Sequence, residues 1–242
     1  MGAYCSAVVS LGLLEIGAVP KVTIVERDPL LFSFWSCVFE HTEEIIGRFL
    51  DLPITLETWH QFSPLLKIDS VKPRDVIKLG LAGLFFNRAN FSGILHGGPI
   101  GGFTQESEYK IDCRSNQGEI VARIMQLAQL APYVTVKFGD GLQQIKKDLK
   151  KKRVLYYVDP PYFEMGRRLY RYYFKLRDHK QLAETLKKAQ FPWVLSYDRN
   201  HVIEFLYDGC DVRKHGFHYS ARSRKRESEL VIASFKLPAH LV

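Results

Sequence analysis

The apolar run Val154–Val158, which stops abruptly at a pair of prolines, is the feature that most restricts how this chain can fold. Such a run of residues with high β-propensity indicates a buried strand. The next residues, Asp159-Pro160-Pro161-Tyr162, cannot continue a strand ladder, because proline has no backbone N–H to donate. A carboxylate and an aromatic ring are therefore expected at the carboxyl edge of a sheet, where open α/β sheets bind ligands. The sequence thus predicts an α/β fold.

The residue types of this tetrad suit the transfer of a group to an exocyclic amine of a nucleobase. Such an amine is a poor nucleophile because its lone pair is delocalised into the ring. The Asp159 carboxylate and a backbone carbonyl of the proline pair could each accept one of its N–H groups, which would localise the lone pair. Tyr162 offers a face on which a flipped-out base could stack. The alternative is an accidental loop, which composition makes rare, at roughly one chain in a thousand.

Composition narrows the possible classes of protein. The 242 residues are 46% hydrophobic, enough for one domain or one core with an insertion, which excludes a disordered chain. The net charge of +8 favours a polyanionic partner. The four cysteines and eight histidines show no metal-ligand spacing, so we expect no metal, no disulfide framework and a reducing, cytoplasmic setting. The apolar stretch 7–19 contains Glu15 and is too short to span a bilayer, so no membrane partner is expected.

Strands and helices alternate at both ends of the chain but not in its middle. Helices are predicted at 6–18, 30–40, 119–131, 142–150, 178–188 and 200–207, and strands at 21–25, 133–137, 154–158, 193–196 and 229–235. Between 41 and 118, prolines and glycine pairs replace this alternation. We therefore predict a catalytic domain formed by residues 1–44 and 119–242, with residues 45–118 inserted as a mainly helical subdomain.

Three carboxylates directly follow predicted strands. Glu26 stands where a nucleotide-binding sheet places an acid to hold ribose hydroxyls. Asp140 follows the strand near residue 137 and could accept from the adenine amino group of a cofactor. A solvated strand-end charge for Glu26 and a turn or capping role for Asp140 are the alternatives. Together with Asp159, they predict a cofactor pocket and a reaction centre along one sheet edge.

Basic and aromatic residues alternate after the tetrad. Cations can neutralise phosphates while aromatic faces stack on unpaired bases. The candidates for nucleic-acid contact in this segment are Arg167, Arg168, Tyr170, Arg171 and Lys175. A solvated basic loop anchored to the core by Tyr172 or Phe174 is an equal alternative. Arg222 and Arg224 form a second candidate cluster, while Arg88 and Asn90 either position the target or support the glycine-rich loop structurally.

Several stretches resemble, in order, the Dam-like DNA adenine-N6 methyltransferases. The tetrad is shared with other amino-methyltransferases, whereas the Asn-Arg-x-x-Phe-Ser-Gly element is specific to this family. The resemblance covers nearly the whole chain. The matching stretches are Asn87-Arg88-Ala89-Asn90-Phe91-Ser92-Gly93, Asp159-Pro160-Pro161-Tyr162, Leu169-Tyr170-Arg171-Tyr172-Tyr173-Phe174, Asp178-His179, Trp193-Val194-Leu195-Ser196-Tyr197-Asp198 and Glu229-Leu230-Val231-Ile232.

The resemblance implies a Rossmann-like methyltransferase sheet that uses S-adenosylmethionine, without a metal, to methylate adenine in double-stranded DNA. Residues 45–118 match the position of the family's target-recognition subdomain. By position, Asp159, Pro160, Pro161 and Tyr162 match the catalytic pocket. The residues that match the cofactor site are Gly2, Ala3, Glu26, Asp140 and Asp159.

The chain departs from the family at its start, where the resemblance implies that the first strand of the sheet is missing. A separate N-terminal fragment is therefore one expected partner, and a cognate restriction nuclease is another. The setting implied is bacterial, phage or mobile-element. The alternatives are a catalytically impaired DNA-binding remnant and an amino-methyltransferase that acts on RNA or on cytosine-N4.

Overall fold

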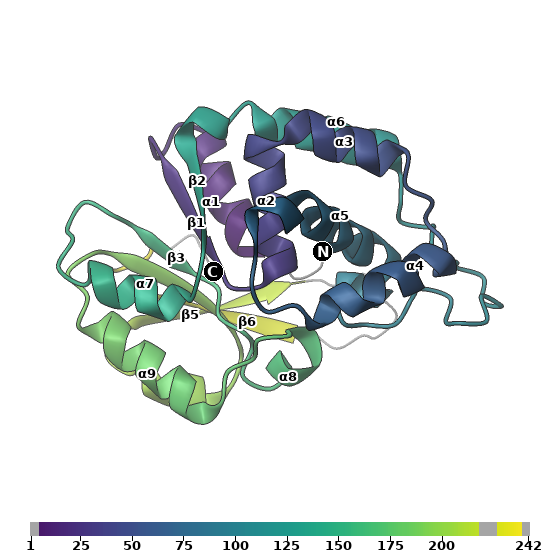
Figure 1. Ribbon diagram of the computed structural model, residues 1–242. Coiled ribbons are helices and arrows are strands. Elements are labelled where there is room, and N and C mark those ends of the chain that lie inside the picture. Colours follow the sequence, from purple (N-terminus) through teal and green to yellow (C-terminus); the bar gives the residue numbers. More distant parts are fainter. Residues whose placement is uncertain (1–4, 218–226, 239–242) are drawn as a thin grey trace. The chain divides into compact units, whose positions relative to one another are not determined.

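The computed structural model describes residues 5–217 and 227–238, which divide into two compact units. Unit 1 spans Met1–Gly141, and unit 2 spans Leu142–Val242. Each unit has its own sheet, so the two are described separately (Figure 1).

The helices and strands follow one another in the order shown in Figure 1. In unit 1 they are α1 (Cys5–Glu15), β1 (Val22–Glu26), α2 (Pro29–Glu40), α3 (Thr42–Leu50), α4 (Leu56–Phe62), α5 (Val76–Ala89), α6 (Gln117–Ala128) and β2 (Val134–Phe138). Helix α7 (Gly141–Asp148) begins at the boundary. Unit 2 continues with β3 (Tyr156–Val158), α8 (Gly166–Leu169), α9 (Leu176–Lys187), β4 (Trp193–Asp198), α10 (His201–Leu206), β5 (Asp211–Phe217) and β6 (Glu227–Ala233). Short 3-10 helices lie at Ser63–Lys67, Pro73–Asp75, Phe91–Gly93 and Ala131–Tyr133.

In unit 1, β1 and β2 form a parallel two-stranded sheet in which Glu26 is the register partner of Phe138. Helix α2 begins directly after β1, because the Asp28 side chain accepts from the Leu30 N–H at 2.9 Å and Pro29 occupies the first turn. Both α1 and α2 contact β1, so the strand is held between its neighbour in the sheet and two helices. The end of β1 is thus fixed in place.

Helix α5 packs closely against α2 because two glycines face it. A Cβ atom at Gly83 would lie 2.7 Å from the Leu30 carbonyl oxygen, and one at Gly80 would lie 2.8 Å from the Ser33 carbonyl oxygen. The helices of the middle segment share a core with the residues around it: Ile45, Phe49, Leu81 and Leu84 cluster with Trp35, Val38, Val22, Ile24 and Ile124. Figure 1 shows α3 lying alongside α6. Residues 45–118 therefore pack as part of unit 1.

Unit 2 contains a four-stranded sheet in the order β3-β4-β6-β5. Strands β3 and β4 are parallel, while β6 is antiparallel to both β4 and β5. Helices α7 and α9 lie beside this sheet in Figure 1, and their apolar side chains join its core. Along β4, Trp193, Leu195 and Tyr197 are fully buried. The site residues at the ends of β3 and β4 therefore rest on a well-packed sheet.

Most of the predicted elements are confirmed. The fold is mixed α/β, the strands and helices predicted from residue 6 to residue 40 and from residue 119 onward occur within a few residues of their predicted positions, and residues 41–118, all of them described, contain helices and no strand. The closing strands β5 and β6 are antiparallel. The assignment of 45–118 to a separate subdomain stays a prediction.

The strands before the three carboxylates divide between two sheets in the described residues, and the prediction of one shared sheet edge stays a prediction. The strands that precede Glu26 and Asp140 pair with each other, whereas the strand that precedes Asp159 belongs to the other sheet. A single sheet would need β1 or β2 to be joined to a strand of the other sheet, and no such pairing occurs among the strands formed by residues 5–217 and 227–238. Pairing depends on contacts between distant segments, which the local pattern of a strand does not contain.

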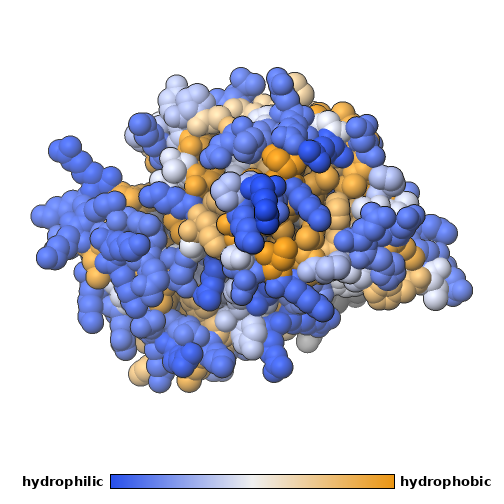
Figure 2. All heavy atoms as spheres, viewed as in Figure 1, coloured by the Kyte–Doolittle hydropathy of each residue, from blue (hydrophilic) through white to orange (hydrophobic). Residues whose placement is uncertain are grey.

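Over the same described ranges, no helix combines the length and the apolar character needed to cross a membrane. Hydrophilic residues dominate the face of unit 2 shown in Figure 2, whereas hydrophobic residues surface in patches over unit 1. The exposed large apolar side chains of unit 1 include Phe91, Phe103 and Tyr109.

The close contact between α2 and α5 predicts a large effect of one methyl group. Gly83→Ala should lower the free energy of unfolding by about 2 kcal/mol, because the new Cβ would overlap the Leu30 carbonyl oxygen and force the helices apart. Gly47→Ala is the matched control: this glycine is exposed within α3, with nothing near its added Cβ, and the change should stabilise by about 0.5 to 1 kcal/mol. Urea denaturation measures both, and equal effects at the two positions would contradict the packing argument.

Candidate active site

The tetrad begins directly after β3, which ends at Val158, and it is held by residues of the neighbouring strands. Asp159 is partly buried, and its Oδ1 accepts a hydrogen bond from the Ser196 hydroxyl at 2.9 Å. The Tyr157 hydroxyl lies 3.2 Å from the same Ser196 oxygen, so a chain of hydrogen bonds runs from β3 through β4 to the carboxylate. Within the described residues, Oδ2 of Asp159 has no hydrogen-bond partner. One carboxylate oxygen is thus fixed and the other is left to accept.

The environment of Asp159 favours its protonated form more than water does. Burial raises the pKa of Asp159 from 3.8 to about 6, the hydrogen bond from Ser196 opposes this rise, and the negative charge of Glu229 adds to it. At neutral pH the group is still mostly ionised, but it holds a proton more readily than an exposed Asp does. A side chain with such a shift beside a ligand edge is a candidate for acid–base chemistry.

The aromatic member of the tetrad is also anchored. The Tyr162 hydroxyl donates to Glu229 Oε1 at 2.7 Å, and its ring meets the Tyr170 ring edge-on, with 6.2 Å between the centroids. Desolvation and the bond to Glu229 raise the pKa of Tyr162 far above its usual value, so the phenol remains a neutral donor. Pro160, which follows Asp159 in the chain, is buried.

The next two residues are tied to the same sheet by Asp198, at the end of β4. Its carboxylate accepts from the backbone N–H of Phe163 at 2.7 Å and from that of Glu164 at 2.9 Å. Ser196, Asp198 and Glu229 were not among the predicted site residues. For Ser196 and Asp198, the sequence signal that could have found them is their spacing. They lie two residues apart on β4, so both are on one face of the strand.

The basic and aromatic segment after the tetrad lies partly at the surface. Arg167 and Arg168 are exposed on α8, Lys175 is exposed, and the Arg171 guanidinium lies over the Tyr172 ring at 5.6 Å. Phe174 anchors the segment by packing against His179 and the core of unit 2, as the structural alternative predicted. The contact between Tyr170 and Tyr162 links this segment to the tetrad. It therefore combines surface cations with a direct connection to the candidate site.

In unit 1, Glu26 and Asp140 lie at the ends of adjacent strands. Glu26 Oε1 accepts from the Asp28 N–H at 2.7 Å, and Asp140 forms an exposed ion pair with Arg27 at 3.0 Å. Phe138, the register partner of Glu26, has 41% of its surface exposed and its ring contacts Phe32. Two carboxylates and an aromatic face therefore gather at this end of the two-stranded sheet.

Asn90 takes the structural role of the two that the sequence left open. It is fully buried, its Oδ1 accepts from Trp59 Nε1 at 2.7 Å, and its Nδ2 donates to the carbonyls of Ile94 and Leu95. No part of its side chain is available for DNA, so we do not retain it as a DNA contact. Arg88 binds Asn87 Oδ1 through its guanidinium, and it is only partly buried.

Four of the predicted site residues cannot be located. Gly2, Ala3, Arg222 and Arg224 lie outside the described residues. Among the residues that are described, no group of three or more His, Cys, Asp or Glu side chains is arranged to hold a metal ion.

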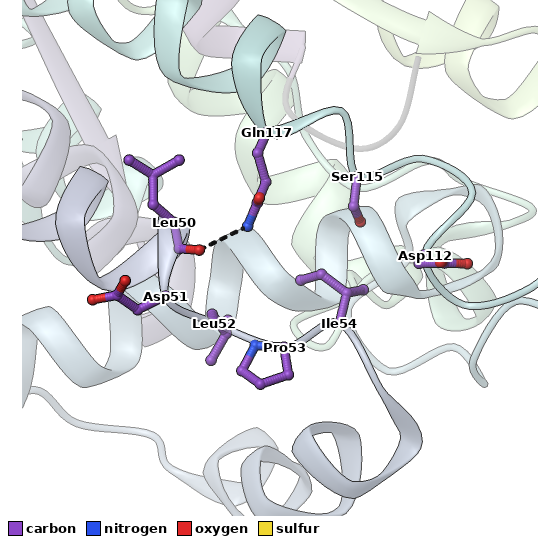
Figure 3. A pocket seen from close by; sticks show the side chains of 8 residues that line it. All are labelled: Leu50, Asp51, Leu52, Pro53, Ile54, Asp112, Ser115 and Gln117. Carbon is purple, nitrogen blue, oxygen red and sulfur yellow. Dashed lines mark hydrogen bonds between the residues drawn. The ribbon is translucent and has the colours of Figure 1, made fainter.

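A pocket of about 400 Å³ lies elsewhere in unit 1, between the loop after α3 and the start of α6 (Figure 3). Gln117 reaches across it to donate to the Leu50 carbonyl at 3.3 Å. The lining residues are Leu50, Asp51, Leu52, Pro53, Ile54, Asp112, Ser115 and Gln117. They include neither a basic nor an aromatic side chain, and none of the predicted site residues, so this pocket is not the candidate active site.

The raised pKa of Asp159 predicts a pH-dependent cost to stability. Unfolded Asp159 titrates near 3.8 and folded Asp159 near 6, so the cost is absent below pH 4, grows between pH 4 and 6, and is complete above pH 6. Asp159→Asn keeps an acceptor for Ser196 without the charge. It should raise the free energy of unfolding at pH 7 by up to about 3 kcal/mol and leave it nearly unchanged at pH 4. Denaturation at both pH values measures this, and a variant less stable than wild type at pH 7 would contradict it.

Comparison with known proteins does not assign a family to this geometry. No protein-family model matches the chain, and no curated protein matches it. The function is therefore inferred from the side chains and contacts described above.

Proposed function

We propose that this chain is a DNA adenine-N6 methyltransferase that uses S-adenosylmethionine, with a Rossmann-like architecture of the Dam-like type. The observation that carries the proposal is the tetrad at the end of β3. It combines a carboxylate with one oxygen held by Ser196 and the other left to accept, a proline pair of which Pro160 is buried, and a tyrosine held by Glu229. These are the groups that an exocyclic amine needs around it.

In the proposed mechanism, the target adenine is flipped out of the duplex and its 6-amino group lies beside Asp159. Asp159 Oδ2 accepts one N–H of this amine and the Pro160 carbonyl accepts the other, which localises the nitrogen lone pair toward the methyl donor. Tyr162 stacks on the base and helps to offset the few kcal/mol that flipping costs. When bound, S-adenosylmethionine supplies a methyl group activated by its sulfonium charge. With a pKa near 6, Asp159 is ionised at neutral pH. It can therefore accept the proton that the amine nitrogen loses when it is methylated.

The end of the two-stranded sheet in unit 1 provides groups that fit the adenosine part of this cofactor. Glu26 is proposed to accept from the ribose hydroxyls and Asp140 from the adenine amino group, and the half-exposed Phe138 ring offers a stacking face. Asp140 is now paired with Arg27 at the surface, so the cofactor must share or replace this pairing. Exposed pairs of this kind contribute little to stability, so the replacement costs little.

The net charge of +8 and the exposed cations of α8 support DNA as the substrate. Phosphate contacts supply most of the affinity of such proteins, and they weaken as the salt concentration rises. The contact of Tyr170 with Tyr162, the residue proposed to stack on the base, supports a role of this basic and aromatic segment at the same site. Arg167, Arg168, Arg171 and Lys175 are therefore the proposed phosphate contacts.

The proposed reaction predicts transfer of labelled methyl from S-adenosylmethionine to unmethylated DNA. The label should be found in N6-methyladenine, and Asp159→Ala should reduce transfer by at least about a hundredfold while DNA affinity stays within about twofold, because Asp159 acts on the amine and not on phosphates. Nucleoside analysis of the product identifies the methylated base.

The other outcomes of this experiment distinguish the rival functions. Label in N4-methylcytosine or in RNA would identify a different amino-methyltransferase. Salt-sensitive DNA binding by a folded chain without any transfer would identify a binding protein and overturn the enzymatic proposal. Equal loss of transfer and DNA binding in Asp159→Ala would overturn the role assigned to Asp159.

The cations of α8 predict a separable effect on DNA binding. Replacing both Arg167 and Arg168 by Ala should weaken DNA binding about tenfold and lower the slope of log affinity against log salt by about two. Replacing Lys146 and Lys147 on α7 by Ala removes the same charge from another helix of unit 2 and is the control. If both double variants lose the same affinity, only the net charge matters and α8 is not the contact surface.

A further inference from the structure

Two carboxylates face each other across the antiparallel pair β4–β6. Asp198 and Glu229 are direct register partners, so their side chains lie on the same face of the sheet. Like charges at such positions destabilise a sheet unless donors compensate them. The donors come from three consecutive residues: the Tyr162 hydroxyl bonds to Glu229, and the backbone N–H groups of Phe163 and Glu164 bond to Asp198. This pair of carboxylates therefore holds Tyr162, Phe163 and Glu164 in place.

Asp198 and Glu229 bind different parts of the segment that follows β3. Asp198 holds only backbone, whereas Glu229 holds a side chain, through one short bond of 2.7 Å to the Tyr162 hydroxyl. A phenol bonded at its hydroxyl cannot swing about its χ1 angle without losing this bond, so the position of the Tyr162 ring is fixed. Glu229 is also close enough to Asp159 for its charge to favour a proton there.

We propose that Glu229 is a positioning residue of this reaction centre, which holds the Tyr162 ring in position for stacking and whose negative charge favours a proton on Asp159. This inference rests on the proposed function and adds to it a residue that touches neither the base nor the cofactor. The same carboxylate thereby acts on both the stacking residue and the amine acceptor.

Among the described residues, the groups linked to Asp159 come from two strands and the loop. Ser196 of β4 donates to Asp159, Tyr157 of β3 is bonded to Ser196, and Tyr162 of the loop is bonded to Glu229. Burial is the largest cause of the raised pKa of Asp159, Ser196 opposes it, and Glu229 is the charged group that adds to it. Removing the charge of Glu229 must therefore lower this pKa.

Two substitutions separate the two roles. Glu229→Gln keeps an oxygen that can accept from Tyr162 but removes the charge, whereas Glu229→Ala removes both. Glu184→Gln is the matched control, since it removes one negative charge from an exposed position of α9 in the same unit. The first readout is the titration of the Asp159 carboxyl carbon by NMR in the protein alone, which does not require activity. The second is the pH profile of methyl transfer.

With Glu229→Gln, the Asp159 titration and the acid limb of the pH profile should both move from near pH 6 toward lower pH, while Glu184→Gln moves neither. Glu229→Ala should add a loss of transfer of roughly tenfold to a hundredfold, the usual effect of deleting a hydrogen bond to a charged group. An Asp159 titration that is unchanged in Glu229→Gln, or moves equally in Glu184→Gln, would overturn the proposal. Absence of methyl transfer in wild type with the NMR shift present would overturn the proposed function but leave the control of Asp159 by Glu229 standing.

Discussion

The arrangement of the candidate site depends on a set of hydrogen bonds between the tetrad segment and the ends of β4 and β6. Two adjacent prolines cannot donate to a sheet, so the chain leaves β3 without ladder bonds to guide it. Ser196, Asp198 and Glu229 replace those bonds and hold residues 159–164 through side-chain oxygens. The positions of Asp159 and Tyr162 follow from these contacts.

This arrangement has a cost in stability. Asp159 is kept where its charge is disfavoured, and two further carboxylates face each other across neighbouring strands. The large apolar side chains beneath, such as Trp193 and Leu195, bury surface that outweighs this penalty. Sites that trade stability for a reactive side chain are common among enzymes, and this pattern supports the proposed role of Asp159.

In unit 1, a buried polar side chain stabilises the fold and does not form part of a candidate site. The amide of Asn90 is consumed entirely by Trp59 and by two carbonyls of its own loop, so a residue type suited to DNA contact serves to hold the loop. The sequence pattern around Asn90 allowed both roles, because an amide has the same donors and acceptors in either. Only burial distinguishes them, and burial depends on how α4 and the loop after α5 pack together.

The local pattern of residues was sufficient to predict the α/β class, the helices and strands outside the middle segment except α8 and β5, and the tetrad at the end of a strand. Those features depend on neighbours in the chain: apolar runs, capping side chains such as Asp28, and prolines that stop a strand. The tertiary structure alone decided that the strands form two sheets, that Glu229 meets Tyr162, and that Ser196 meets Asp159. These contacts join residues 37 and 67 positions apart, and they arise from strand pairing and shared burial, which no local pattern encodes.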